Sequence, residues 1–523
     1  MRAEVPALLL LLAAAPRSLW GGELTAAEVR GKQIYTQGTS ASGVGIKAAL
    51  GDDGNEVPAS ALPCAGCHGL DGRGGKEGGV RPSDLTPEAL GRPAHGEAGG
   101  RSHPPYDDRR LVRAIAMGFD PAGNRLHVAM PRYRLTRQDA ADLLAYLKRL
   151  GHEEEPGLSA TAVHLGVLLP GGKRQETEAE AVQAALTARC AELNRGGGLY
   201  GRQLRLHFVR LPESLPAAGV KLPELLAGQP AFALIAVHPA GTGDEIATAA
   251  EAAGTPLISA LSSRPRETFP LNRYAFHLTP GLAEQAKALV EFAALRLPQR
   301  GRLAIVRPGT GEMAGLAEGV ETAAREHGFT AVEPVAAEVL AAQAGRLARE
   351  GTAALLLLEG GSATRELLRQ AQDLGWRPLV LMPASLSGAF PGEDPFAVVP
   401  AFLGDRLFIS LPVLPADWTS GAAEGYRRLA AASTLPAYHV AAQRAALAAA
   451  EVLMEGLKQA GREVSREKLI ATLEKLYRFD AGLGAPVTFG PNRRIGARGA
   501  FIAAVDLAHH TLGREISWVD LGP

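Results

Sequence analysis

The residues best suited to chemistry form one short run, Cys64-Ala65-Gly66-Cys67-His68. Two thiols at this spacing can form thioethers to the two vinyl groups of one porphyrin, and the adjoining histidine is then held against the iron as its proximal ligand. A thioredoxin-like redox site would need a βαβ context, and a zinc site would need a second cysteine or histidine pair. The chain has only one further cysteine, Cys190, so neither alternative fits. The sequence therefore predicts one covalently attached haem c, held by Cys64, Cys67 and His68.

The opposite face of a cytochrome iron takes a thioether or an imidazole. The candidates of these types beyond the motif are Met117, Met130, His95, His103 and His127. We choose Met130 as the sixth ligand, because Pro131 biases the preceding residue away from helix and lets its side chain point inward. Met117 falls in a helical pattern over residues 111–118, where apolar packing is the simpler interpretation. For His127, an imidazole with no ligand role is the simpler interpretation.

Two capping patterns frame the haem motif. Thr25-Ala-Ala-Glu28 predicts the start of a helix that runs to about Tyr35. Thr136 and Asp139 form a second capping signal, which precedes apolar residues at helical spacing: Ala140, Leu143, Leu144 and Leu147. The glycine-rich stretches 43–54 and 69–75 lack a periodicity that a packed helix or strand could use, so we expect them to wrap the porphyrin.

Residues 24–150 as a whole resemble a class I cytochrome c. The resemblance rests on an N-terminal helix, the run C-A-G-C-H-G, a methionine-containing segment that reads M-P-R-Y, and a last helix that ends A-Y-L-K-R-L. It implies an all-α domain, His68 as the proximal ligand, Met130 as the distal ligand, and electron transfer as the activity. It also implies a redox partner protein, such as a periplasmic dehydrogenase or oxidase. The long loop before Cys64 departs from the smallest members and suggests a more covered haem edge.

The first residues indicate export. Arg2 precedes an apolar run over residues 5–15, and small residues follow. A membrane anchor would need about twenty apolar residues, and this run is shorter and interrupted by proline. We therefore predict a signal peptide over residues 1–22, cleaved after Ala15 or after Gly22, and a periplasmic location, which agrees with a cofactor attached outside the cytoplasm.

The pattern changes after a charged break, His152-Glu-Glu-Glu-Pro-Gly157. Apolar strand-like runs then alternate with helical patterns, which favours parallel sheets covered on both faces. The segment is too long for one doubly wound sheet, so we expect two α/β lobes with a ligand cleft between them. The predicted boundaries are 23–151 for the cytochrome domain, 152–160 for the linker and 161–523 for the larger domain.

Other functional classes find no support in the sequence. Lysine plus arginine and aspartate plus glutamate number 55 each, so no net charge favours nucleic acid as a partner. No G-x-G-x-x-G run opens a helix after a strand, which argues against dinucleotide binding, and no G-x-S-x-G or H-E-x-x-H run supports a hydrolase.

Several patterns in the larger domain resemble type I periplasmic binding proteins of the LivJ-like branched-chain amino acid class, which serve ABC transporters. These patterns are the helix-to-strand turn 194–206, the strand 274–280, the helix that opens Tyr438-His-Val-Ala-Ala-Gln-Arg, and the runs Phe479-Asp480 and Val487-Thr-Phe-Gly490. Together they span almost all of residues 160–523. The resemblance implies a two-lobed fold, a small-molecule ligand and an ABC permease as a further partner.

The resemblance also implies where the ligand lies. Its polar loops match residues 238–242, with Thr242, and residues 259–263, with Ser262 and Ser263, whose hydroxyl and N–H groups would take a polar head. Ordinary loop polarity explains these residues equally well. The family's aromatic ring has no counterpart near residues 309–312, and its acid for the ligand's ammonium group is replaced by Ala384. An unpaired buried ammonium is costly, so we expect a small polar ligand that is not a standard amino acid, unless Glu312 supplies the acid.

Three hypotheses for function follow. The leading one is an exported haem c electron carrier with a fused solute-binding domain, which serves a periplasmic dehydrogenase and is not itself an enzyme. The second is a substrate-binding protein of an ABC importer with an accessory cytochrome. The third is a haem enzyme, which would need an open iron position and therefore conflicts with Met130 as a ligand.

Overall fold

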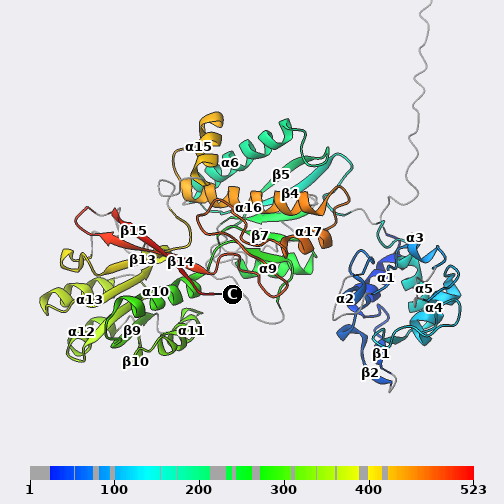
Figure 1. Ribbon diagram of the computed structural model, residues 1–523, viewed down its shortest axis with the longest axis horizontal. Helices are drawn as coiled ribbons and strands as arrows, with labels where there is room; N and C mark the ends of the chain where they lie inside the picture. The colour runs from blue at the N-terminus through cyan, green and yellow to red at the C-terminus, as the bar shows by residue number, and fades with distance from the viewer. Residues whose placement is uncertain are drawn as a thin grey trace, which may run out of the picture. The chain divides into compact units, whose positions relative to one another are not determined.

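The computed structural model divides the chain into two compact units, Met1–Glu155 and Pro156–Pro523. The division falls within the residues expected to form the linker. Each unit is described by itself (Figure 1). The residues that the structure describes are 24–51, 54–74, 82–94, 101–152, 155–172, 175–212, 231–237, 243–261, 271–307, 312–336, 339–359, 362–387, 399–414, 422–509 and 511–522.

The first unit contains five described α-helices. They are α1 (Ala26–Gln37), α2 (Cys64–His68), α3 (Pro87–Leu90), α4 (Asp108–Met117) and α5 (Arg137–Leu147), with a short helical turn at Ala59–Ala61. Both predicted capping signals form capping boxes, at Thr25 with Glu28 and at Thr136 with Asp139. These boxes satisfy backbone N–H groups that a helix start would otherwise leave without partners.

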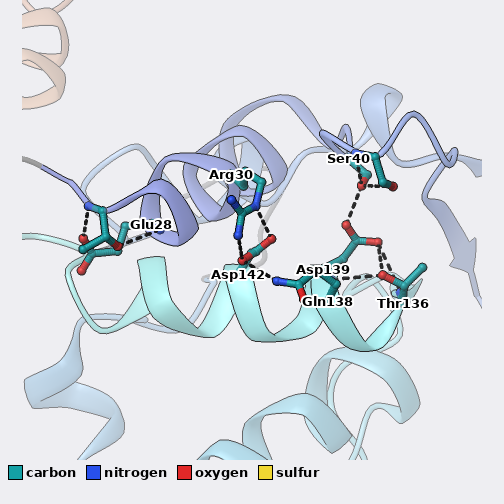
Figure 2. A network of polar contacts seen from close by, with 9 residues as sticks. Glu28, Arg30, Ser40, Thr136, Gln138, Asp139 and Asp142 are labelled. Carbon is teal, nitrogen blue, oxygen red and sulfur yellow. Dashed lines mark hydrogen bonds and ion pairs between the residues drawn. The ribbon is translucent and has the colours of Figure 1, made fainter.

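Helices α1 and α5 pack at close range because Gly31 carries no side chain at their crossing. A Cβ added at Gly31 would lie 2.0 Å from the backbone oxygen of Asp142. Beside this contact, the Arg30 guanidinium donates to both Asp142 oxygens at 2.7 and 2.8 Å, as Figure 2 shows. The Ser40 hydroxyl donates to Asp139 at 2.5 Å. Polar side chains of α1 and of the loop after it therefore bind α5 beside the apolar contact of the two helices.

A small antiparallel sheet lies between these helices in the sequence. It comprises β1 (Lys47–Leu50), β2 (Asn55–Pro58) and β3 (Arg132–Arg134) in the order β2-β1-β3. The expectation that residues 43–54 contain no packed strand was therefore wrong. Ala48 is fully buried between its partners Val57 and Tyr133. The strand is stabilised by pairing with a distant segment, and local periodicity carries no signal of such pairing.

The second unit begins with a five-stranded parallel sheet in the order β5-β4-β6-β7-β8. Its strands are β4 (Ala162–Leu169), β5 (Gln203–Arg210), β6 (Ala233–Ala236), β7 (Leu257–Ser259) and β8 (Ala275–His277). Its helices are α6 (Glu176–Arg195), α9 (Gly243–Ala252), α15 (Ala422–Ser433), α16 (Val440–Ala460) and α17 (Arg466–Leu473). Leu168, Leu234 and Ala236 pack against Ile246 and Ala250 of α9, so α9 covers one face of the sheet.

The second lobe holds a seven-stranded sheet in the order β10-β9-β11-β12-β13-β14-β15. The strands are β9 (Arg302–Arg307), β10 (Ala331–Ala336), β11 (Thr352–Leu357), β12 (Leu379–Pro383), β13 (Leu407–Leu411), β14 (Gly499–Asp506) and β15 (Thr511–Asp520). The helices are α10 (Leu282–Arg296), α11 (Glu312–Glu326), α12 (Leu340–Arg349), α13 (Ser362–Asp373) and α14 (Ala384–Ser387), with a short helical turn at Ala401–Leu403. The strands are parallel up to β13, and β14 and β15 add an antiparallel edge.

Two apolar cores cover the faces of this second sheet. One core includes α10 and α11 residues, and the other includes α12 and α13 residues. The chain crosses between the lobes after β8, after β13 and before β14, and His277 pairs with Ile495 where two of these crossings meet. The predicted two-lobed α/β fold is confirmed. Within the described residues, no helix combines the length and the apolar character that a membrane span requires.

A candidate haem site

The first unit encloses a cavity of about 620 Å³ beside the C-x-x-C-H motif. Most of its walls are apolar, and residues such as Leu85, Ile115 and Leu143 line it. Six of the predicted or alternative haem contacts also line it: Cys64, Cys67, His68, Met130, His103 and His127. Met117 does not line this cavity, and His95 lies outside the described residues.

The motif forms a single helical turn, α2, that begins directly after Pro63. The spacing of three residues brings Cys64 and Cys67 to the same side of the turn. The Tyr133 hydroxyl donates to the Leu62 carbonyl oxygen at 2.6 Å. The Tyr35 hydroxyl donates to the Gly69 carbonyl oxygen at 2.7 Å. Two tyrosines therefore fix the backbone on either side of the motif.

The His68 ring is oriented by the backbone. Its side chain is buried, and Nδ1 lies 2.8 Å from the Ser83 carbonyl oxygen. A carbonyl oxygen can only accept, so Nδ1 carries the proton and Nε2 keeps a lone pair for a metal. Burial lowers the pKa of His68 below its usual range, and the hydrogen bond to Ser83 opposes this shift only in part. The imidazole is therefore neutral near pH 7, as a ligand must be.

The Cys64 thiol and the neighbouring phenol are also neutral. Burial raises the pKa of the Cys64 thiol to about 12. Burial, with a smaller effect of Cys64 and Cys67, raises the pKa of Tyr133 well above its usual range, so its hydroxyl stays protonated and can donate. Two thiols on one turn, a neutral imidazole with a lone pair and mostly apolar walls fit a covalently bound haem c.

Met130 lies in a tight turn at the cavity. Its N–H donates to the His127 carbonyl oxygen at 3.0 Å, and its side chain packs against the apolar core of the unit. Met117 is not packed in the core, although the sequence had predicted that it would be. It is the last residue of α4 and is 62% exposed, so apolar packing does not explain it. The C-terminal end of α4 rotates this position away from the core that Ala114 and Ile115 enter.

The two imidazoles at the cavity differ in their hydrogen bonds. His127 Nδ1 accepts from the Ala129 N–H at 3.2 Å, so a neutral His127 carries its proton on Nε2 and has no lone pair there. His103 Nδ1 lies 2.8 Å from the Pro104 carbonyl oxygen and therefore donates, which leaves Nε2 free to ligate. His103, rather than His127, is thus the alternative to Met130. No sequence pattern indicates which ring nitrogen of each histidine carries the proton.

Three residues that support the site were not found from the sequence. Tyr35, Tyr133 and Ser83 act through hydrogen bonds to or from backbone groups, between 15 and 71 residues away along the chain. Only Tyr133 had a signal, as the last letter of M-P-R-Y. Backbone partners leave no complementary side chain for a pattern search to detect.

The predicted solute site is only partly visible. Thr242, Ser262 and Ser263 lie outside the described residues, and so does the side chain of Glu312, which opens α11. These assignments therefore stay predictions. Among the described neighbours, Ser259 and His277 are paired at the ends of β7 and β8 and are buried. Ala384 is half-buried directly after β12.

A second cavity, of about 640 Å³, lies in the first lobe of the larger unit between α6, α15 and α16. Two arginines in its lining have partners within the protein. Arg189 contacts Glu451 at 2.6 Å, and Arg444 donates to the carbonyl oxygens of Leu414 and Gly482.

Comparison with known proteins agrees with both units. A family model described as periplasmic binding protein matches residues 162–510, and one described as cytochrome c matches residues 52–151. Among curated proteins, none matches the chain.

Solved structures match the larger unit. An ABC transporter substrate-binding protein from Aeropyrum pernix is 16% identical with a TM-score of 0.52, covering 69% of this chain and 95% of its own. A leucine-binding protein, LivK, from Thermotoga maritima is 17% identical with a TM-score of 0.50, covering 68% and 99%. A branched-chain amino acid ABC transporter protein from Thermus thermophilus with bound valine is 17% identical with a TM-score of 0.50, covering 68% and 95%. At these identities the likeness shows the fold alone. The chain belongs to the periplasmic binding protein family, and it carries a cytochrome c domain with covalently attached haem c ahead of that fold.

Proposed function

We propose that this protein is an exported electron carrier whose haem iron is held between His68 and Met130, fused to a receptor for a small solute. The observation that carries the proposal is the cavity whose walls include both thiols, a buried neutral His68 and Met130. Bound haem c supplies one-electron redox chemistry. His68 would offer its Nε2 lone pair to the iron, Met130 would offer a thioether, and the apolar walls would exclude water.

Two axial protein ligands distinguish a carrier from an enzyme. A carrier exchanges electrons at the haem edge, whereas a haem enzyme needs an open iron position for its substrate. We expect the reduced full-length holoprotein to bind carbon monoxide slowly and weakly. Fast, tight binding together with a high-spin ferric spectrum would contradict the carrier function.

The redox partner is proposed to be a periplasmic dehydrogenase or oxidase, and the signal peptide over residues 1–22 is proposed to direct export. The support is chemical, because an exported carrier needs a donor and an acceptor in the same compartment. Electron transfer from candidate exported dehydrogenases to the oxidised holoprotein can be followed by stopped-flow haem absorbance. Reduction by none of them would remove this partner class.

The solute is proposed to be small and polar but not a standard amino acid. Ala384 is the supporting residue, because its methyl group cannot pair with a ligand ammonium group, and a buried unpaired ammonium is costly. A thermal-shift screen of the full-length holoprotein against small carboxylates, alcohols and amino acids tests this, since binding to the native state raises stability. Saturable stabilisation by leucine or valine at micromolar concentration would contradict the proposal.

Coupling between the units is a separate proposal. If solute binding acts on electron transfer, the haem reduction potential or the rate of partner reduction must change when the solute is added. Unchanged values would remove the coupling and leave two independent activities.

A second candidate is a substrate-binding protein of an ABC importer with an accessory cytochrome. The family match over residues 162–510 favours it, because proteins with this fold include ABC transporter substrate-binding proteins. It predicts that a Cys64→Ala, Cys67→Ala variant, which cannot attach haem, still restores solute uptake to cells that lack the protein. Loss of uptake in that variant, at normal protein level, would argue against it.

A further inference from the structure

We propose that Arg132 is a positioning residue that keeps Met130 on the iron. The inference rests on the proposed function, because it takes Met130 as the distal ligand. The turn that carries Met130 is called the methionine loop below and comprises residues 126–130. Three of its five carbonyl oxygens accept from the Arg132 guanidinium: that of Met130, that of Leu126 at 3.3 Å and that of His127 at 3.5 Å.

A guanidinium is suited to bind these three carbonyl oxygens at once. Arginine presents five N–H donors in a rigid plane, so one side chain can bind several oxygens that face the same point. The lysine ammonium has three donors on a flexible stem and cannot hold this spread of oxygens as rigidly. The positive charge also strengthens each hydrogen bond relative to a neutral donor.

The backbone of Arg132 is itself anchored. Arg132 opens β3, and its neighbour Tyr133 pairs with Ala48 and donates to Leu62 just before the haem motif. Successive strand residues point to opposite faces. Tyr133 therefore binds the segment before Cys64, and Arg132 binds the methionine loop. Two segments that line the cavity are thus held by neighbouring residues of one strand.

Gly118 provides the space for the guanidinium. It ends α4 with φ +74°, and its carbonyl oxygen accepts from the Leu126 N–H at 2.8 Å, which closes the segment ahead of the methionine loop. A Cβ added at Gly118 would lie 1.9 Å from Arg132 Nε. Alanine at this position would displace the guanidinium from its carbonyl partners without changing Arg132 itself, and it would also strain the backbone, because a residue with a Cβ disfavours this positive φ.

The expected consequence is a competition at the iron. A soluble imidazole can replace Met130 only when the methionine loop opens, so any residue that stabilises the closed loop weakens imidazole binding. Loss of the Arg132 hydrogen bonds should favour the open loop. The apparent imidazole affinity then rises, because a larger fraction of the protein is competent to bind it.

The test uses the full-length ferric holoprotein and imidazole as the probe. We expect Arg132→Met to raise the imidazole affinity about tenfold, the equivalent of one charged hydrogen bond lost. Arg132→Lys should raise it less. Arg134→Met is the matched control, because Arg134 lies in the same strand, is exposed and contacts Glu56 rather than the methionine loop. Its affinity should equal that of the wild type.

The result that overturns the inference is an unchanged imidazole affinity in Arg132→Met while Met130→Ala removes the methionine–iron charge-transfer band. If the wild type itself lacks the band, so that its spectrum does not differ from that of Met130→Ala, the assignment of Met130 as the ligand is overturned instead. If Arg132→Met does not accumulate with haem, Arg132→Lys and Gly118→Ala carry the test. Unchanged affinity in both of those variants overturns the inference equally.

Discussion

At the scale of single residues, the haem motif depends on hydrogen bonds from two buried phenols to backbone oxygens. Tyr133 fixes the Leu62 carbonyl before the motif, and Tyr35 fixes the Gly69 carbonyl after it. His68 gains its ring orientation in the same way, from the Ser83 carbonyl. The chemistry resides in the side chains of Cys64 and His68, whereas their positions depend on neighbours whose contribution is purely geometric.

Tyr133→Phe should lower the free energy of unfolding of the cytochrome unit by about 1–3 kcal/mol, because the Leu62 carbonyl loses its partner. Denaturant unfolding of the full-length holoprotein, followed by haem absorbance, measures the change. Tyr477→Phe is the control, since Tyr477 is 77% exposed in the larger unit. Equal stability of wild type and Tyr133→Phe would show that the hydrogen bond does not hold the motif.

At this scale the sequence predicts the haem-binding residues better than the residues that position them. The motif by itself indicates haem c, because few functions need two thiols and an imidazole within five residues. Haem c attachment is confirmed by the family comparison. The choice of Met130 stays a prediction, and the tautomers of His103 and His127 depend on backbone oxygens and N–H groups that no sequence pattern reveals.

At the scale of elements, the cytochrome unit depends on the crossing of α1 and α5. The backbones approach closely at Gly31, and the rim is joined by Arg30 with Asp142 and by Ser40 with Asp139. Both helices begin with capping boxes, so their N-termini are fixed by local sequence. The crossing itself is set by the absence of one Cβ.

Gly31→Ala should destabilise the cytochrome unit by about 1–3 kcal/mol through overpacking. The added Cβ meets backbone atoms of Asp142, which cannot move aside as a flexible side chain would. Haem-detected denaturant unfolding provides the measurement. The control is Gly45→Ala, because a Cβ at Gly45 meets nothing within 4 Å. A variant at Gly31 as stable as that at Gly45 would contradict the close approach.

The Arg30–Asp142 pair predicts a pH dependence. The hydrogen bond from Arg30 holds the pKa of Asp142 below its usual range despite burial. Stability from this pair is therefore fully present above the unfolded pKa, about 3.9, and is lost as the pH falls through the lower folded pKa. Asp142→Asn should be less stable than wild type at pH 7, and the difference should shrink below about pH 3.9.

The measurement is denaturant unfolding of the full-length holoprotein across this pH range. Asp108→Asn is the control, because Asp108 pairs with Lys148 at an exposed site and surface pairs contribute little. A stability difference for Asp142→Asn that does not change with pH would contradict the assigned ionisation.

Helices and strands were predicted correctly where a local hydrophobic pattern marks them. They were missed where burial depends on a distant segment of the chain. The apolar run at 162–169 coincides with β4, and the helical pattern at 282–295 lies within α10. Strands β1 and β2 were missed, because Ala48 is buried by pairing with Tyr133, 85 positions further along the chain. Met117 was expected in the core and is exposed, because the last turn of α4 places it beyond the packed face.

At the scale of the whole molecule, two units with separate cores share one chain. The apolar core around Tyr35 and Tyr146 contains only residues of the first unit, and the cores of the second unit contain none of these. The predicted two-part architecture and the periplasmic-binding-protein fold are confirmed. The solute site stays a prediction, because Thr242, Ser262, Ser263 and the side chain of Glu312 lie outside the described residues, and no periodic sequence pattern marks polar ligand contacts.

Separate cores predict separate unfolding. Calorimetry of the full-length holoprotein should show two transitions, of which only one coincides with the change in haem absorbance. Gly31→Ala should lower the temperature of that transition and leave the other unchanged, because the substituted contact lies wholly in the first unit. A single transition that shifts as a whole would show that the two units unfold together.

The most direct test of the account is the ligation of the iron in the full-length oxidised protein. We predict a low-spin spectrum with the methionine–iron charge-transfer band, which Met130→Ala abolishes and His103→Ala leaves intact. A wild-type spectrum without that band, or a low-spin spectrum that His103→Ala converts to high spin while Met130→Ala does not, would contradict the assignment of Met130 as the partner of His68.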